Sequence, residues 1–105
     1  MLESQINTIE RLPNVHPGEV LKEEFLSPMN VSAYTLAKEI NVPETRISEI
    51  IHGKKAVTAD TAIRFAKFFG TTAEFWLHLQ NLYDLEKEEK LNAPEFEMIK
   101  MHAYA

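Results

Sequence analysis

Residues 32–55 read SAYTLAKEINVPETRISEIIHGKK and contain the signals that decide the fold. Ser32 can cap a helix that runs to about Ile40, and Pro43 can open a second helix that stops before Gly53. Between the two helices, Asn41 tolerates the left-handed backbone conformation in which helices commonly end. The stretch therefore predicts two short helices that are joined by a tight turn.

The spacing within this stretch is typical of a DNA-binding helix-turn-helix. Such a motif needs a small residue where the helices touch, a turn residue that tolerates the left-handed conformation, and apolar anchors on the second helix. These requirements are met in order by Ala37, Asn41, Val42, Ile47 and Ile50. An ordinary helical hairpin also needs small and apolar residues at its contact, so it stays open as the alternative.

Helical periodicity divides the second helix into two faces. At about 100° per residue, Ile47, Ile50 and Ile51 share the buried side. We expect the other side to enter the major groove of double-stranded DNA, where side chains contact base edges, and lysines after the helix to contact phosphates. The candidate DNA-binding residues are Thr45, Arg46, Ser48, Glu49, His52, Lys54 and Lys55. For Glu49 the alternative is an ion pair with Arg46, and for the two lysines it is plain solvation.

Charge is divided unevenly along the chain. The 105 residues carry a net charge of −5, which by itself argues against non-specific coating of nucleic acid. Residues 43–67 nevertheless hold five basic and three acidic residues, or +2, whereas residues 84–97 hold six acidic and two basic residues, or −4. The predicted DNA-binding segment is therefore locally positive.

Three further helices are expected, which gives an all-α fold of five helices. One runs from Pro17 to Pro28, and one runs from Thr58 to Phe69. The last opens at a capping box, Thr71 to Glu74, and extends to about Glu89. We assign residues 1–15 to an N-terminal extension, 16–90 to the helix-turn-helix domain and 91–105 to a C-terminal tail.

The last helix carries more apolar surface than one core-facing stripe requires. Exposed apolar patches usually mark a contact with a partner, and operators are commonly bound by two-fold dimers. We therefore expect a homodimer, with wider packing inside the chain as the alternative. The candidate interface residues are Trp76, Leu77, Leu79, Tyr83 and Leu85.

Several classes of function find little support. Without cysteine the chain has no disulfide and no cysteine-based metal site, and its four scattered histidines do not predict a metal. No nucleophile–base pair or glycine-rich phosphate loop stands out, so we expect neither catalysis nor a cofactor. No apolar run approaches the length of a membrane span, and we expect a cytoplasmic protein without a membrane partner.

Five segments resemble the HigA-type, or VapI-like, addiction-module antitoxins of the Xre/Cro-like (lambda repressor-like) helix-turn-helix superfamily. They are HPGE at 16–19, ISEIIHGKK at 47–55 with TADTAIRFA at 58–66, and FGT at 69–71 with FWLHLQ at 75–80. The resemblance extends over about residues 16–86. In this family a second basic residue often stands where this chain has Thr45, and asparagine often stands at Ser48.

The resemblance implies a dimeric antitoxin that represses its own operon from operator DNA. It also implies a HigB-like toxin partner with an mRNA-endonuclease fold. At matching positions it assigns base reading to Thr45, Arg46 and Ser48 and backbone contacts to Lys54 and Lys55. We expect the toxin to be basic, with the acidic segment 84–97 and the N-terminal extension as candidate contacts. The alternatives are a stand-alone Xre-type regulator without a toxin and a protein-interaction module that no longer binds DNA.

Overall fold

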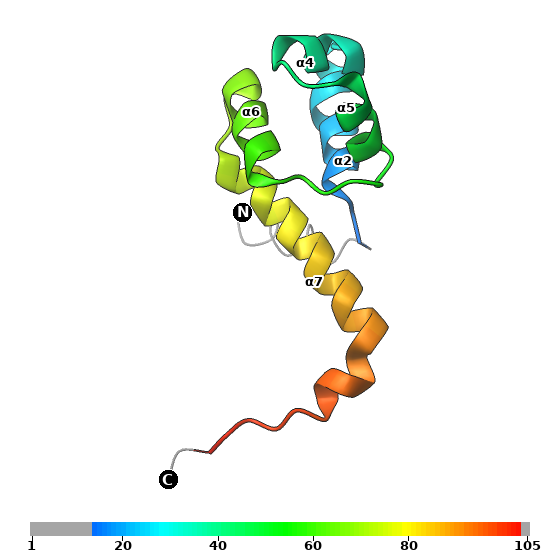
Figure 1. The fold of residues 1–105 in the computed structure, drawn as a ribbon, viewed down its shortest axis with the longest axis vertical. Helices are drawn as coiled ribbons and strands as arrows, with labels where there is room; N and C mark the ends of the chain where they lie inside the picture. The colour runs from blue at the N-terminus through cyan, green and yellow to red at the C-terminus, as the bar shows by residue number, and fades with distance from the viewer. Residues whose placement is uncertain (1–13, 104–105) are drawn as a thin grey trace.

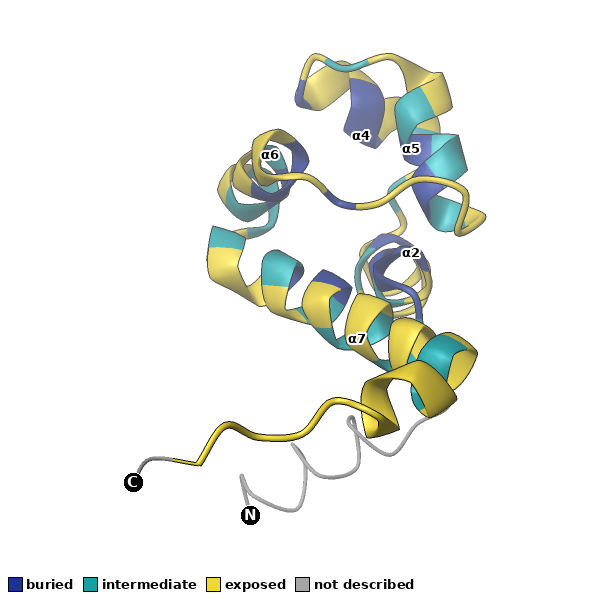
Figure 2. Cartoon of the chain, turned by 60° about the horizontal axis from the view of Figure 1, so that its bottom comes forward, coloured by how far each residue is buried: buried dark blue, intermediate teal, exposed yellow. Residues whose placement is uncertain are grey.

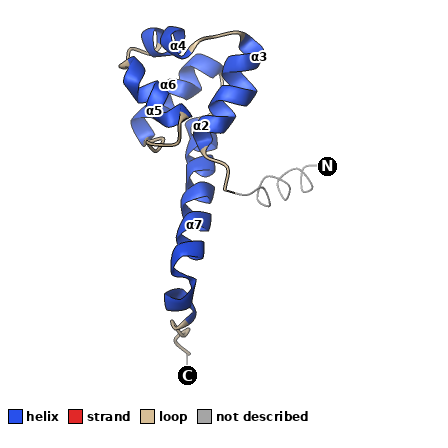
Figure 3. Ribbon diagram, turned by 90° about the vertical axis from the view of Figure 1, so that its right-hand side faces the viewer, coloured by secondary structure: helices blue, strands red, loops and turns tan. Residues whose placement is uncertain are grey.

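The computed structural model describes residues 14–103, and this range is entirely helical apart from its turns and ends (Figures 1 and 3). Because the first three elements follow one another without a break, this described range contains the five consecutive helices that the sequence predicts. The predicted extension at residues 1–15 lies almost wholly outside the described residues. The elements are α2 (Pro17–Val20), η1 (Leu21–Leu26), α3 (Ser27–Met29), α4 (Ala33–Glu39), α5 (Glu44–Ile51), α6 (Ala59–Phe69) and α7 (Ala73–Glu97).

The first helix begins at Pro17 as predicted, but Pro28 does not end it. Its middle, η1, is π-helical, and there the N–H of Ser27 bonds to the carbonyl oxygen of Lys22, five residues back. This wider turn lies directly before Pro28, which has no N–H to continue the regular helical pattern. The helix then ends at Asn30, which takes the left-handed conformation with φ of 55°.

The core lies where the five helices converge, and their inward faces are the buried ones in Figure 2. Trp76 of α7 is its largest fully buried side chain, and its ring lies 5.0 Å from the rings of both Phe25 and Phe65. The indole N–H donates to the hydroxyl of Thr71 at 2.8 Å, so the buried ring leaves no unsatisfied donor. Trp76 was predicted as a dimer-interface residue, and that prediction is wrong because its side chain is 0 % exposed within one copy.

Helix α7 differs from the prediction at both ends. Its N-cap is Thr72, whose hydroxyl accepts from the N–H of Phe75, rather than Thr71. It also continues past Glu89 to Glu97, across a kink at Asn92. Pro94 is tolerated because it comes at the first turn after the kink, where a missing N–H breaks no helical bond. Part of the predicted tail is thus helical, and the second half of α7 extends away from the other helices (Figures 1 and 3).

Candidate nucleic-acid interface

Helices α4 and α5 form the predicted helix-turn-helix. Ser32 caps α4 by accepting from the N–H of Thr35 at 3.0 Å. Asn41 adopts the left-handed conformation with φ of 59°, which brings the N–H of Val42 to the carbonyl oxygen of Ala37 at 3.0 Å. This bond closes the end of α4 and turns the chain into α5. The turn therefore forms by the mechanism that the sequence indicates.

The two faces of α5 also match the prediction. Ile47 and Ile50 are fully buried, and Ile51 is half-buried. On the outward side, Thr45 and His52 are exposed, whereas Ser48, Glu49 and Arg46 are half-buried.

His52 has a defined orientation at the end of α5. Its Nδ1 lies 2.7 Å from the carbonyl oxygen of Ser48. Since a carbonyl oxygen can only accept, Nδ1 carries the proton and donates. In the neutral ring Nε2 is therefore an acceptor, and in the protonated ring it becomes a second donor.

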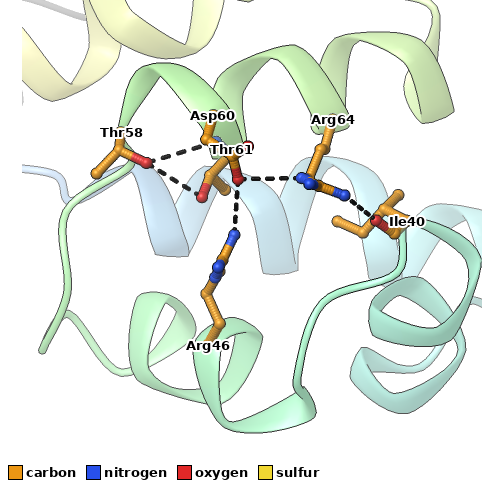
Figure 4. A network of polar contacts seen from close by, with 6 residues as sticks. All are labelled: Ile40, Arg46, Thr58, Asp60, Thr61 and Arg64. Carbon is orange, nitrogen blue, oxygen red and sulfur yellow. Dashed lines mark hydrogen bonds and ion pairs between the residues drawn. The ribbon is translucent and has the colours of Figure 1, made fainter.

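Arg46 belongs to a network that the sequence did not reveal (Figure 4). Its Nη1 donates to Oδ2 of Asp60 in α6 at 2.8 Å, so its ion-pair partner within residues 14–103 is Asp60 and not Glu49. The same oxygen accepts from Nε of Arg64 at 3.0 Å, and Nη1 of Arg64 donates to the carbonyl oxygen of Ile40 at 2.8 Å. The network joins the turn, α5 and α6.

The electrostatic effect of this network falls on Asp60. The guanidinium of Arg64, followed by that of Arg46, holds the pKa of the Asp60 carboxyl below its ordinary value. The side chain of Arg46 remains 38 % exposed, and a guanidinium has five N–H donors. Donors thus remain for a DNA contact while Nη1 stays bonded to Asp60.

The loop after α5 presents two exposed lysines. Gly53 takes φ of 74°, and the N–H groups of Lys54 and Lys55 both donate to the carbonyl oxygen of Glu49, at 2.8 and 3.2 Å. The backbone of the loop is therefore tied to the end of α5. Lys54 and Lys55 are both exposed.

Two residues from distant elements hold this loop, and the sequence did not identify their role. Nδ1 of buried His16 accepts from the N–H of Gly18 at 2.9 Å, and its ring meets Tyr83 edge-on at 4.8 Å. The ring also lies beside Gly53, where a Cβ would stand 3.8 Å from it. Burial lowers the pKa of His16, against the opposing effect of the Asp84 carboxylate.

Gln80 of α7 holds the other end of the loop. Its Oε1 accepts from the buried N–H of Val57 at 2.8 Å, and its Nε2 donates to Asp84 at 2.9 Å. The segments HPGE and FWLHLQ contain His16 and Gln80, but their contacts cross the chain and are not readable from local spacing. These two residues position the lysine loop without being candidates for DNA contact.

The remaining dimer-interface candidates on α7 are not fully buried, although Leu77 and Leu79 pack against the core. Leu77, Leu79 and Tyr83 are half-buried, and Leu85 is 59 % exposed. Across residues 14–103 no group of acidic, histidine or cysteine side chains could hold a metal ion. Nor does any helix in that range combine the length and the apolar character needed to cross a membrane.

Comparison with known proteins gives a consistent result. A family model described as Helix-turn-helix matches residues 21–76. Virulence-associated protein I of Dichelobacter nodosus is 47 % identical over 79 residues, which cover 75 % of this chain and 73 % of that protein.

Two solved structures share the fold over 87 % of this chain and the whole of the other. One is an addiction-module antidote protein of the HigA family from Coxiella burnetii, with a TM-score of 0.82 and 42 % identity. The other is Pseudomonas aeruginosa antitoxin HigA with the higBA promoter, with a TM-score of 0.83 and 32 % identity.

Proposed function

Because the chain belongs to the HigA-type, or VapI-like, family of Xre/Cro-like helix-turn-helix proteins, we propose that it is a DNA-binding antitoxin that represses its own operon. The observation that carries the proposal is the outward face of α5, where Thr45 and His52 are exposed and which is continued by two exposed lysines. The similar Pseudomonas aeruginosa HigA was solved with promoter DNA, which supports the same use of this face.

In this proposal α5 lies in the major groove of operator DNA. Thr45 and Ser48 contact base edges, and Arg46 contacts a base with the donors that Asp60 leaves free. His52, Lys54 and Lys55 contact phosphates, which fix the position of the protein without reading sequence. Glu49 accepts from a cytosine amine or excludes other bases.

The protein acts as a homodimer in this proposal, since operators of this kind are read as two half-sites. Of the predicted interface, Leu77, Leu79, Tyr83 and Leu85 remain candidates, while Trp76 is withdrawn because it is buried. A role on operator DNA also implies that the protein works in the cytoplasm.

The second half of the proposal is neutralisation of a HigB-like toxin. A nuclease that binds RNA carries positive charge, which is complementary to an acidic partner. Exposed Asp84 and Glu88 lie one helical turn apart on α7, within the acidic segment. We assign the toxin contact to this segment, together with the N-terminal extension.

The test of DNA binding is a titration with the duplex upstream of the protein's own gene against a scrambled duplex of equal length. Tight binding to the native duplex alone supports the proposal. Equal affinity for both duplexes would contradict sequence-specific repression.

The toxin is tested separately by co-expression with the neighbouring small basic reading frame. A stable complex that restores host growth supports an antitoxin, and charge reversal by Glu88→Lys should weaken that complex. If no such gene lies beside this one, a stand-alone regulator is the better description.

A further inference from the structure

A groove runs between the first helix and α7. Its lining combines apolar side chains, here called the floor, with glutamates from both helices, here called the rim. The floor includes Val20, Phe25, Phe75, Leu79 and Leu82. The rim includes Glu19, Glu23, Glu24, Glu86 and Glu89, with Lys90 as the only basic lining residue within the described range. The groove therefore suits a ligand that is apolar and cationic.

The end of the chain has the complementary chemistry. Beyond α7, residues 98–103 read MIKMHA, with cationic Lys100 and no acidic residue. Met98, Ile99 and Met101 are 80, 74 and 94 % exposed. Large apolar side chains with this degree of solvent exposure usually mark a surface that a partner covers.

The tail cannot reach the apolar floor of its own groove. Leu79 lies 18 residues before the end of α7 at Glu97, which is about 27 Å of helix at 1.5 Å per residue. Met101 is the fourth residue past that end and can reach back at most about 14 Å. The kink at Asn92 shortens this path but does not close so large a gap.

The tail of a second copy has no such restriction. In a two-fold dimer each contact occurs twice, so the tail of each copy can enter the groove of the other. The N-terminal residues 1–13 carry two glutamates and one arginine, and their net negative charge does not match the acidic rim.

We propose that residues 98–103 of one copy dock into the groove between the first helix and α7 of a second copy, so that exchanged tails hold the homodimer. Met98, Ile99 and Met101 cover the apolar floor, and Lys100 faces the glutamate rim. The inference rests on the dimer in the proposed function and specifies how that dimer is built.

The first test changes only exposed tail residues, so the fold is preserved. The double variant Ile99→Glu/Met101→Glu places acid in an acidic groove and should convert the dimer to a monomer by light scattering. Ile63→Glu, at a half-exposed position on α6, is the matched control and should stay dimeric. A double variant that remains as dimeric as the parent overturns the tail exchange and leaves the dimer itself standing. A parent chain that is monomeric throughout overturns both.

The second test uses the absence of cysteine from the chain. Leu79→Cys and Met101→Cys are prepared separately, mixed and oxidised mildly, and a disulfide-linked heterodimer is expected. The mixture of Ile63→Cys with Met101→Cys is the control and should not give that product. When both cysteines are on one chain, a cross-linked monomer would overturn the exchange in favour of folding back. If the Leu79→Cys and Met101→Cys variants both stay dimeric but their mixture gives no disulfide-linked heterodimer, the exchange is likewise overturned.

Discussion

The α-carbon of Gly18 lies so close to the carbonyl group of Ile50 that a Cβ at position 18 would stand 1.8 Å from the Ile50 oxygen. The first helix and α5 therefore touch backbone to backbone. Because α5 carries the outward face proposed to bind DNA, this contact sets how far that face projects from the body of the protein.

Gly18→Ala should destabilise the protein and weaken operator binding. A backbone clash cannot be relieved by a rotamer change, so the two helices must move apart, at a cost of about 1–3 kcal/mol or more. Urea unfolding measures the first effect and operator titration the second.

The matched control is Gly70→Ala. A Cβ at Gly70 meets nothing within 4 Å, although its φ of 77° strains any other residue, at about 1–2 kcal/mol. Both variants should lose stability, but only Gly18→Ala should lose operator affinity. Equal loss of affinity in the two would contradict the role assigned to the Gly18 contact.

His16 should make stability depend on pH. Burial lowers the pKa of His16 below its ordinary value of 6.5, so the unfolded chain binds this proton more readily. The stabilising contribution is therefore complete above about pH 6.5 and declines as the pH falls below it. Protonation also removes the lone pair that accepts from the N–H of Gly18.

The measurement compares the parent with His16→Asn, which keeps a capping acceptor but does not titrate. The difference in free energy of unfolding should be constant above pH 6.5 and shrink below it. The other histidines cancel in this difference. A difference that stays flat down to pH 5 would refute the prediction.

The helix-turn-helix could be predicted because its signals are local. Ser32, Asn41 and Thr58 act through bonds to residues three to five positions away, so sequence spacing reveals them. The outward face of α5 follows in the same way from helical periodicity.

The supporting contacts could not be predicted because they connect distant parts of the chain. Arg46 meets Asp60 across 14 positions, Val57 meets Gln80 across 23, and His16 contacts α7. The burial of Trp76 could not be predicted for a related reason, since α7 is apolar around much of its circumference. Only the packing of Phe25 and Phe65 determines which of its apolar residues enters the core.

Asp60→Asn should loosen the junction between α5 and α6. The substitution removes the charge that both Arg64 and Arg46 pair with, so stability should fall, and more so at low salt. The two ion pairs lower the pKa of the Asp60 carboxyl. The parent should therefore be more stable than Asp60→Asn above pH 3.8, the ordinary pKa, and this difference in stability should disappear as the pH falls through the lowered pKa.

Urea unfolding at two salt concentrations checks this, with Glu95→Gln as an exposed acidic control on α7. The control should show little change. Operator preference should also broaden at the base that Arg46 contacts, because its guanidinium is no longer oriented. Unchanged salt dependence in Asp60→Asn would argue against the network.

Gln80→Met should cost about 1–3 kcal/mol, because it leaves the buried N–H of Val57 without an acceptor. Methionine has a similar length, so the loss of packing is small. Asn81→Leu, at the exposed neighbouring position, is the control and should stay within about 0.5 kcal/mol of the parent. Hydrogen exchange should speed up at Val57 in Gln80→Met alone, and equal exchange in both variants would contradict the assignment.

Lys54→Ala and Lys55→Ala should each weaken binding to native and scrambled duplexes alike. Every phosphate contact that is lost should flatten the dependence of log affinity on log salt by about one unit. Lys90→Ala, in the half of α7 that extends away from α5, removes the same charge and should leave the slope unchanged (Figure 1). Thr45→Ala should instead cost about 1–3 kcal/mol on the native duplex only. A slope that falls equally in Lys54→Ala and Lys90→Ala would mean that net charge, rather than this loop, governs binding.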